Sequence, residues 1–309
     1  MFIDNLIDKI KELNNPSVAG LDPKLEYIPD YILNECFEKY GETPKACGKA
    51  IKKFNYALID AIYDIVPAIK PQLAYYEMYG IYGLKAYVKT IEYARSKGML
   101  VITDGKRNDI GSTSKAYSNA YLGNTKIKDI SFKAFESDAL TVNPYLGIDG
   151  IQPFIEDCID NGKGIFALVK TSNPSSGQLQ DLKFEDGRTV YETVADMVDE
   201  WGKQVIGEYG YSSVGAVVGA TWPEQAASLR KRMKNTFFLV PGYGAQGGTA
   251  ESIKVNFNDD GLGAIVNASR SFMCAYRSDR WSDKFSAEQF ADAARAEMIR
   301  MRDDINSVL

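Results

Sequence analysis

Three charged residues, Asp104, Lys106 and Asp109, stand close together in one short stretch of the sequence. They follow an apolar run at residues 100–102 that is typical of a buried strand. Asp104 and Lys106 lie two residues apart, so both side chains point to the same side of an extended backbone. Unpaired buried charges are costly, but charges of alternating sign offset much of that cost. The stretch therefore predicts a preorganised electrostatic array; a solvated strand end with a salt bridge is the simpler alternative.

The composition limits which chemistry such an array can perform. The 309 residues include no histidine, and the net charge is −5. Ser-His and Cys-His nucleophile pairs, His-ligated metals and imidazole acid–base catalysis are therefore excluded. Lysine becomes the leading candidate proton donor. The acidic balance gives no electrostatic reason to expect nucleic acid or an anionic membrane as the main partner.

The cysteines and the N-terminus indicate where the chain works. Cys36, Cys47, Cys158 and Cys274 are scattered and form no C-x-x-C motif, so neither a disulfide framework nor a zinc ribbon is expected. Residues 2–13 have apolar positions at helical spacing among mixed charges, unlike a signal peptide. No apolar stretch is long enough to span a bilayer. We expect an N-terminal amphipathic helix and a cytoplasmic location.

Eight short apolar runs recur along the chain, and segments with helical spacing separate them. Near-continuous hydrophobicity is typical of parallel strands covered on both faces. The pattern predicts an α/β fold, a (β/α)₈ TIM barrel forming a single domain over residues 1–309. A doubly wound sheet would more often carry a glycine-rich fingerprint after its first strand, where this chain has Gly-Leu-Asp-Pro. The runs are residues 18–22, 68–73, 100–106, 139–143, 165–171, 214–221, 237–244 and 264–270.

Polar residues gather at the ends of these runs. Barrel enzymes place their active sites at the carboxyl ends of the strands, so this one-sided pattern predicts a site there. The polar stretch 173–188 is long for a βα-loop and is interpreted as a lid. The run-end residues are Asp22, Lys70, Asp104, Lys106, Asn143, Lys170, Thr171, Ser172, Thr221, Asn267, Ser269 and Arg270.

The last two runs predict a phosphate site. Residues 241–248, Pro-Gly-Tyr-Gly-Ala-Gln-Gly-Gly, form a glycine-rich turn before a helical pattern, and backbone N–H groups in such turns bind anions. Ser269 and Arg270 follow the final strand, and arginine can clamp a phosphate with two hydrogen bonds. The alternative is a tight turn and an arginine that pairs with a surface acid.

Taken together, these motifs resemble the orotidine 5′-phosphate decarboxylase family, in its longer bacterial-type branch. The resemblance covers most of the chain, in the family's order: GLDP at 20–23, IKPQLAYYE at 69–77, TDGKRNDIGST at 103–113, VNPYLG at 142–147, VKTSNPSS at 169–176, PGYGAQGG at 241–248 and NASRS at 267–271. It implies a cofactor-free carboxy-lyase that converts orotidine 5′-monophosphate to UMP and CO₂ in pyrimidine biosynthesis. It also implies a homodimer with active sites at the subunit interface.

The resemblance assigns the catalytic roles. Lys70, Asp104, Lys106 and Asp109 match the family's alternating array. Loss of CO₂ leaves a carbanion at C6 that does not delocalise into the ring, and the Lys106 ammonium would stabilise and then protonate it. Asn108 is a departure, because glycine is expected there, and it puts the local turn geometry in question.

The resemblance also implies substrate contacts. Asp22 would bind the ribose hydroxyls, and Ser172 the pyrimidine amide edge, with Ser175 and Ser176 as open alternatives. Asp109 and Thr113 would reach the partner's site. Asn143 is expected to line the cavity. The remaining contacts, to the phosphate, would come from Gln246, Ser269 and Arg270.

Neighbouring residues receive plainer interpretations. Tyr75, Tyr76 and Tyr79 are expected to be packing or interface aromatics. Glu77 is interpreted as a helix-start acid, and Lys170 as a surface or inter-strand lysine outside the catalytic set.

Two other functions remain open. A Mg²⁺-dependent sugar-phosphate decarboxylase or aldolase on the same barrel could use Asp104 and Asp109 as ligands; sensitivity to chelators would reveal it. A non-catalytic nucleotide sensor would bind without turnover, although binding alone does not require two lysines beside two acids.

Overall fold

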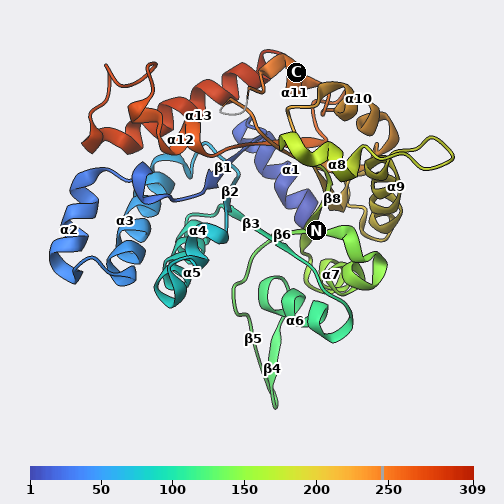
Figure 1. Cartoon of the computed structure of the whole chain (residues 1–309), viewed down its shortest axis with the longest axis horizontal. Coiled ribbons are helices and arrows are strands. Elements are labelled where there is room, and N and C mark those ends of the chain that lie inside the picture. The colour runs from blue at the N-terminus through green and yellow to red at the C-terminus, as the bar shows by residue number, and fades with distance from the viewer. Residues whose placement is uncertain (245–246) are drawn as a thin grey trace.

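The centre of the molecule is a closed barrel of eight parallel strands (Figure 1). The computed structural model describes residues 1–244 and 247–309. Neighbouring strands follow one another round the barrel in chain order, and the last closes on the first. The predicted TIM barrel is confirmed, and the doubly wound sheet is excluded. The barrel strands are β1 (Ser17–Leu21), β2 (Ala68–Pro71), β3 (Leu100–Arg107), β6 (Ala139–Val142), β7 (Gly164–Lys170), β8 (Ser212–Val218), β9 (Thr236–Pro241) and β10 (Ala264–Ala268).

Helices alternate with the strands and form the outer layer (Figure 1). A capping box precedes the last helix, in which Ser286 N donates to Gln289 Oε1 at 3.2 Å. In the described residues no helix is long and apolar enough to cross a lipid bilayer. The helices are α1 (Phe2–Leu13), α2 (Asp30–Tyr40), α3 (Pro44–Ile62), α4 (Ala74–Glu77), α5 (Gly80–Ser96), α6 (Gly111–Tyr121), α7 (Ile148–Asn161), α8 (Gly177–Gln180), α9 (Val190–Gly202), α10 (Pro223–Arg232), α11 (Ala250–Lys254), α12 (Arg270–Met273) and α13 (Phe290–Asn306).

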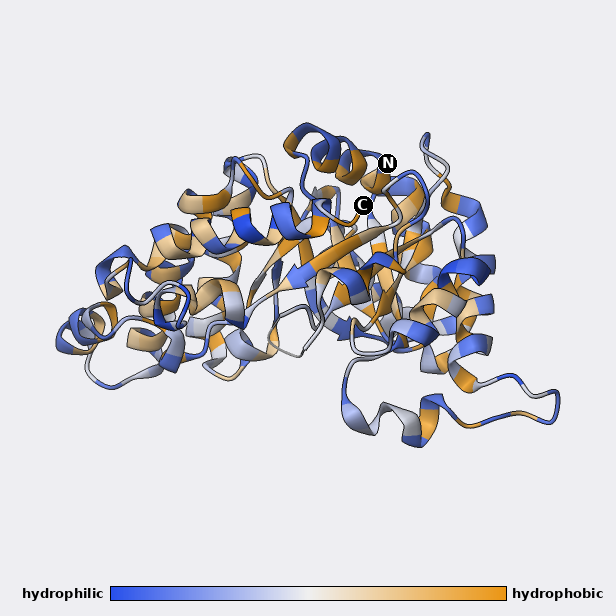
Figure 2. Cartoon of the chain, turned by 90° about the horizontal axis from the view of Figure 1, so that it is seen from above, coloured by the Kyte–Doolittle hydropathy of each residue, from blue (hydrophilic) through white to orange (hydrophobic). Residues whose placement is uncertain are grey.

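The strands are buried along most of their length, and β1, β2, β6, β8 and β10 are buried at every residue. Figure 2 shows hydrophobic residues concentrated on the strands, while many helical segments on the outside are hydrophilic. Both faces of each strand are covered, by the barrel interior on one side and by the helices on the other. Because both faces of each strand are buried, successive strand positions are apolar, and the sequence shows nearly continuous apolar runs.

Helix α1 closes the amino-terminal end of the barrel. Phe2, Ile3, Leu6 and Ile7 are buried in one cluster with strand residues from inside the barrel. The Phe2 and Phe166 rings meet edge to face, with centroids 6.1 Å apart. The predicted amphipathic helix is confirmed, and its apolar face packs on the end opposite to the strands' carboxyl ends.

A small hairpin interrupts the alternation between β3 and β6. It consists of β4 (Thr125–Ile127) and β5 (Ile130–Phe132) and projects away from the barrel (Figure 1). Ile127 and Ile130 are exposed at its tip. Its strands are only three residues long, so the sequence contains no periodic pattern by which it could have been predicted.

Candidate active site

The centre of the site is the carboxylate of Asp104, at the end of β3. Lys70 Nζ, from the end of β2, donates to Asp104 Oδ2 at 3.0 Å. Lys106 Nζ donates to Asp104 Oδ1 at 2.5 Å. The residues Lys70 and Asp104 are only 4% and 8% exposed, which excludes a fully solvated strand end. One buried carboxylate therefore lies between two ammonium groups, and one of these, on Lys106, faces outward.

A distortion of β3 orients Lys106. The register between β3 and β6 shifts between Thr103 and Arg107, and Lys106 has a φ of 48°. Residues other than glycine rarely adopt this left-handed backbone conformation. Bulges of this kind often redirect a side chain next to an active site. The predicted contact between Asp104 and Lys106 is confirmed, but a bulge makes it rather than simple strand alternation.

Two neutral residues complete the hydrogen bonds of Asp104. Gln72 Nε2 donates to Oδ2 at 2.9 Å, and Thr141 Oγ1 donates to Oδ1 at 2.8 Å. Thr141 Oγ1 also accepts from the backbone N–H of Lys106 at 3.0 Å. Neither residue was predicted from the sequence. Thr141 lies inside the apolar run of β6, where a hydroxyl at an otherwise apolar position was the available signal.

These contacts fix the ionisation of the array. Burial alone would raise the pKa of Asp104, but the Lys70 and Lys106 ammonium groups outweigh it and hold that pKa well below its usual range. Burial would likewise lower the pKa of Lys70, but Asp104 and Asp22 outweigh it and raise it. Both shifts favour the charged forms.

A cavity of about 310 Å³ opens beside the array. It lies at the carboxyl ends of the strands, where the sequence analysis predicted a site. Five predicted residues line it together: Asp22, Lys70, Asp104, Ser269 and Arg270. Asn267, a predicted run-end residue, and Pro241, Gly242 and Tyr243 of the predicted phosphate turn also line it, whereas Tyr27 and Tyr75 were not predicted to do so.

Two buried oxygens beside this cavity accept no hydrogen bond from the described residues. They are Asp22 Oδ1 and Asn267 Oδ1. Buried acceptors are normally paired, so both are available to hydroxyl or N–H donors of a bound molecule. Asn267 Nδ2 donates to Ser269 Oγ at 3.1 Å, which links this wall of the cavity to the predicted phosphate end.

The remaining predicted residues that the structure describes, Lys106 among them, lie outside this lining. Asp109 and Thr113 precede and begin α6, and Asp109 Oδ1 accepts from the adjacent Ile110 N at 2.7 Å. Asn143 is exposed and caps a short helical turn by accepting from Tyr145 N at 3.1 Å. Ser172 follows β7, and its carbonyl accepts from Thr221 Oγ1 at 3.1 Å. Gln246 lies outside the described residues.

The turn at Asn108 needs no glycine. The φ angle of Asn108 is not positive, unlike that of Lys106. A Cβ added at Gly150 of α7 would lie 2.3 Å from Asn108 Oδ1. The asparagine side chain therefore packs against a glycine of the next helix.

The structure corrects two of the plainer interpretations, those of Tyr75 and Lys170, and bears out two others. Tyr75 lines the cavity, so it is not only a packing residue. Glu77 lies in the first turn of the four-residue helix α4, as predicted, and also forms an ion pair with Arg107. Lys170 is fully buried at the end of β7 and pairs with Asp181 at 2.5 Å. The packing role of Tyr76, which is fully buried, is confirmed.

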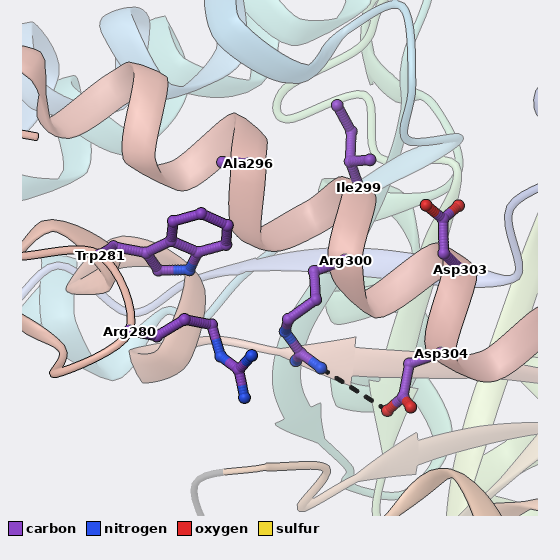
Figure 3. Close-up of a pocket in the computed structure, with 7 residues that line it drawn as sticks. All are labelled: Arg280, Trp281, Ala296, Ile299, Arg300, Asp303 and Asp304. Carbon is purple, nitrogen blue, oxygen red and sulfur yellow. Dashed lines mark ion pairs between the residues drawn. The ribbon is translucent and has the colours of Figure 1, made fainter. Parts of the chain in front are cut away.

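A larger and more open cavity, of about 710 Å³, lies along α13 (Figure 3). Its lining consists of Arg280, Trp281, Ala296, Ile299, Arg300, Asp303 and Asp304. The positive charge of Arg300 is compensated there by ion pairs with Glu297 at 2.8 Å and with Asp304 at 3.6 Å. No strand end contributes to this cavity, so the site beside Asp104 is the better candidate. Among the described residues, no group of three or more cysteines and acids is placed to hold a metal ion.

Comparisons with known proteins show which family the chain is similar to. Residues 46–278 match the family described as "Orotidine 5′-phosphate decarboxylase / HUMPS family". An orotidine 5′-phosphate decarboxylase of Caldicellulosiruptor bescii is 47% identical over 282 residues, covering 91% of this chain and 92% of the relative. One from Rhodopirellula baltica is 43% identical over 304 residues, with 98% of both chains covered. Among solved structures, the OMP decarboxylase of Leishmania donovani is similar, with a TM-score of 0.73 and 27% identity over 99% of this chain and 98% of that one.

Proposed function

The chain belongs to the orotidine 5′-phosphate decarboxylase / HUMPS family, and from that premise we propose that it converts orotidine 5′-monophosphate to UMP and CO₂. The observation that carries the proposal is the Lys70–Asp104–Lys106 chain of ion pairs beside the cavity. Such an array places a fixed ammonium beside a developing carbanion, and the neighbouring carboxylate keeps that ammonium protonated.

In the proposed reaction the bond between C6 and the carboxylate breaks, and its electron pair remains on C6. Lys106 stabilises this charge and then transfers one Nζ proton to C6, which yields UMP and a neutral amine that solvent reprotonates. Asp104 and Lys70 hold Lys106 in place. We propose that the reaction uses no cofactor, because the lysine supplies both the positive charge and the proton.

The proposed substrate pose uses both ends of the cavity. Asp22, with its unpaired buried oxygen, suits the ribose hydroxyls. Ser269 and Arg270, which line the cavity with Gly242 of the glycine-rich turn, would bind the phosphate, and Gln246 would also contact it. Ser172 would contact the pyrimidine, and Asn143 would border the site. Binding energy from the remote phosphate can then raise kcat as well as affinity.

We further propose a homodimer in which Asp109 and Thr113 complete the partner's site. Neither residue lines the cavity of its own chain. Ile110 and Tyr117, on the same loop and helix, are exposed, and exposed apolar patches often mark interfaces.

Mixing two inactive variants tests the shared site. Lys106→Ala and Asp109→Ala each disable one contribution, and a mixed dimer keeps one intact site. Random exchange of subunits would then restore about a quarter of the wild-type activity. If exchange is demonstrated but no activity returns, Asp109 acts within its own chain.

The ultraviolet absorbance of orotidine 5′-monophosphate, followed in excess EDTA, tests the function itself. We expect metal-independent conversion to UMP, lost in Lys106→Ala and retained in Lys49→Ala, which changes an exposed lysine of α3. UMP binding without turnover in the wild type would instead identify a sensor. Activity only on sugar phosphates with Mg²⁺ would mean a different substrate on the same barrel.

The proposed compartment is the cytoplasm. All four cysteines are free thiols, which suits a reducing environment. Fractionation of the source cells with an antibody against the chain tests this location.

A further inference from the structure

Lys170 is a buried lysine for which the proposed reaction has no use. It ends β7, and none of its surface is exposed. Its Nζ lies 5.2 Å from the ring centroid of Tyr191 and 5.1 Å from that of Trp222. Its carboxylate partner is Asp181 at 2.5 Å, and the Asp181 side chain is 46% exposed. Two aromatic faces and one carboxylate thus hold the ammonium.

These partners come from three segments. Asp181 directly follows α8, Tyr191 lies in the first turn of α9, and Trp222 immediately precedes α10. An isolated ammonium would not be buried at a strand end without compensation. Lys170 is therefore the point at which the segment 173–181 is attached to the barrel.

The next residue, Thr171, strengthens the same attachment. Its backbone N–H donates to Gln180 Oε1 at 3.1 Å, and Gln180 Nε2 donates to its hydroxyl at 2.8 Å. The Thr171 carbonyl accepts from Trp222 Nε1 at 3.0 Å. Residues 180–181 and Trp222 thus hold both sides of the chain immediately before Ser172.

We propose that Lys170 is a positioning residue: through Asp181 it fixes α8 against the end of β7 and so presets the backbone of Ser172 for the pyrimidine. The inference rests on the proposed function for the identity of the base. We call the Lys170–Asp181 ion pair the latch. Without the latch, ligand binding would have to order residues 173–181, and the cost of that ordering would lower the affinity. Only the contribution of the pyrimidine base to the affinity should decrease.

The test compares two ligands in three variants. Lys170→Met keeps the length of the side chain and leaves Asp181 partly solvated, so it is the cleaner change. Asp181→Asn leaves the ammonium buried without its carboxylate. In each variant we expect the Kd of UMP to rise about tenfold, while that of ribose 5-phosphate, which lacks the base, changes less than about twofold. The double variant should bind UMP no more weakly than the weaker-binding single variant, because both changes remove the same contact.

Lys163→Met provides the matched control. Lys163 is also buried, precedes the same strand at the opposite end of the barrel, and pairs with Asp138 at 3.4 Å. Its loss should change stability but not the ratio of the two Kd values. If Lys170→Met weakens both ligands equally, or leaves the UMP affinity unchanged, the positioning role is wrong.

Amide hydrogen exchange separates the latch from the proposed function. Lys170→Met should speed exchange in residues 171–181 without any ligand. A wild-type chain that binds no UMP would overturn the proposed function, while faster exchange would still support the latch. Unchanged exchange would overturn the latch even if the enzyme is active.

Discussion

At the residue scale, the site depends on how completely one carboxylate is paired. Asp104 accepts from Lys70, Gln72, Lys106 and Thr141. The two lysines and one aspartate leave a local charge of +1, which suits a substrate carrying a carboxylate and a phosphate. In the proposed dimer, Asp109 of the partner subunit would bring the array to neutrality.

Replacing Thr141 by valine tests the neutral part of this pairing. The change keeps the shape but removes the hydroxyl that donates to Asp104 and accepts from Lys106 N. A buried N–H left unpaired costs about 1–3 kcal/mol, and we expect kcat to fall about tenfold as Lys106 shifts. Thr141→Ser, which keeps the hydroxyl, is the control, and steady-state kinetics with urea denaturation give both numbers. Equal kcat in the wild type and in Thr141→Val would show that the bridge does not position Lys106.

The pH dependence of kcat follows from the shifted groups. Because the pKa of Asp104 is lowered from 3.8, its carboxylate stays ionised until the pH falls through that lowered value, where the ion pairs are lost. Lys70 has a raised pKa and stays charged on the alkaline side. The chain has no histidine, and burial raises the pKa of the Cys274 thiol to about 11. At saturating substrate, kcat should therefore be constant between about pH 5 and 8. A titration midpoint inside that window would contradict this assignment.

At the element scale, the regular part of the barrel could be predicted and the irregular part could not. All eight strands were located from their apolar runs, because burial on both faces leaves a continuous signal. The predicted ends put Asp22, Lys70 and Asp104 at one cavity. Tyr75 was missed as a lining residue because its orientation depends on the geometry of the loop after β2. Lys170 was misjudged because its partners lie 11, 21 and 52 positions further along the chain.

The approach of β1 to β10 gives a prediction at this scale. A Cβ at Gly20 would lie 2.0 Å from Ser269 Oγ, 2.8 Å from Asn267 Oδ1 and 3.0 Å from the Ala268 carbonyl oxygen. Gly20→Ala should therefore cost about 1–3 kcal/mol of unfolding free energy and should weaken UMP binding by displacing Ser269. Denaturation and calorimetry measure the two effects.

Gly20→Ala/Ser269→Ala is the matched double variant. It removes the nearest clash, so it should be more stable than Gly20→Ala alone. A single variant as stable as the wild type would mean that the two strands separate easily.

At the scale of the whole molecule, the two ends of the barrel serve different purposes. The carboxyl ends of the strands carry the charged array and the cavity. The opposite end is closed by the apolar face of α1, which shares a buried cluster with the barrel interior. Barrel enzymes commonly divide function and stability in this way. Changes at the closed end should then affect the unfolding free energy without altering the chemistry.

Leu6→Ala tests this division directly. Leu6 is fully buried in the cluster beneath the barrel, and removing a buried leucine side chain costs about 2–5 kcal/mol. We expect a loss of that size in the unfolding free energy from urea denaturation, with kcat and KM unchanged while the protein remains folded. Asn5→Ala, at an exposed position of the same helix, should leave both properties unchanged. If Leu6→Ala lowers kcat in fully folded protein, the packing of α1 is transmitted through the strands to the array, and the two ends of the barrel are coupled.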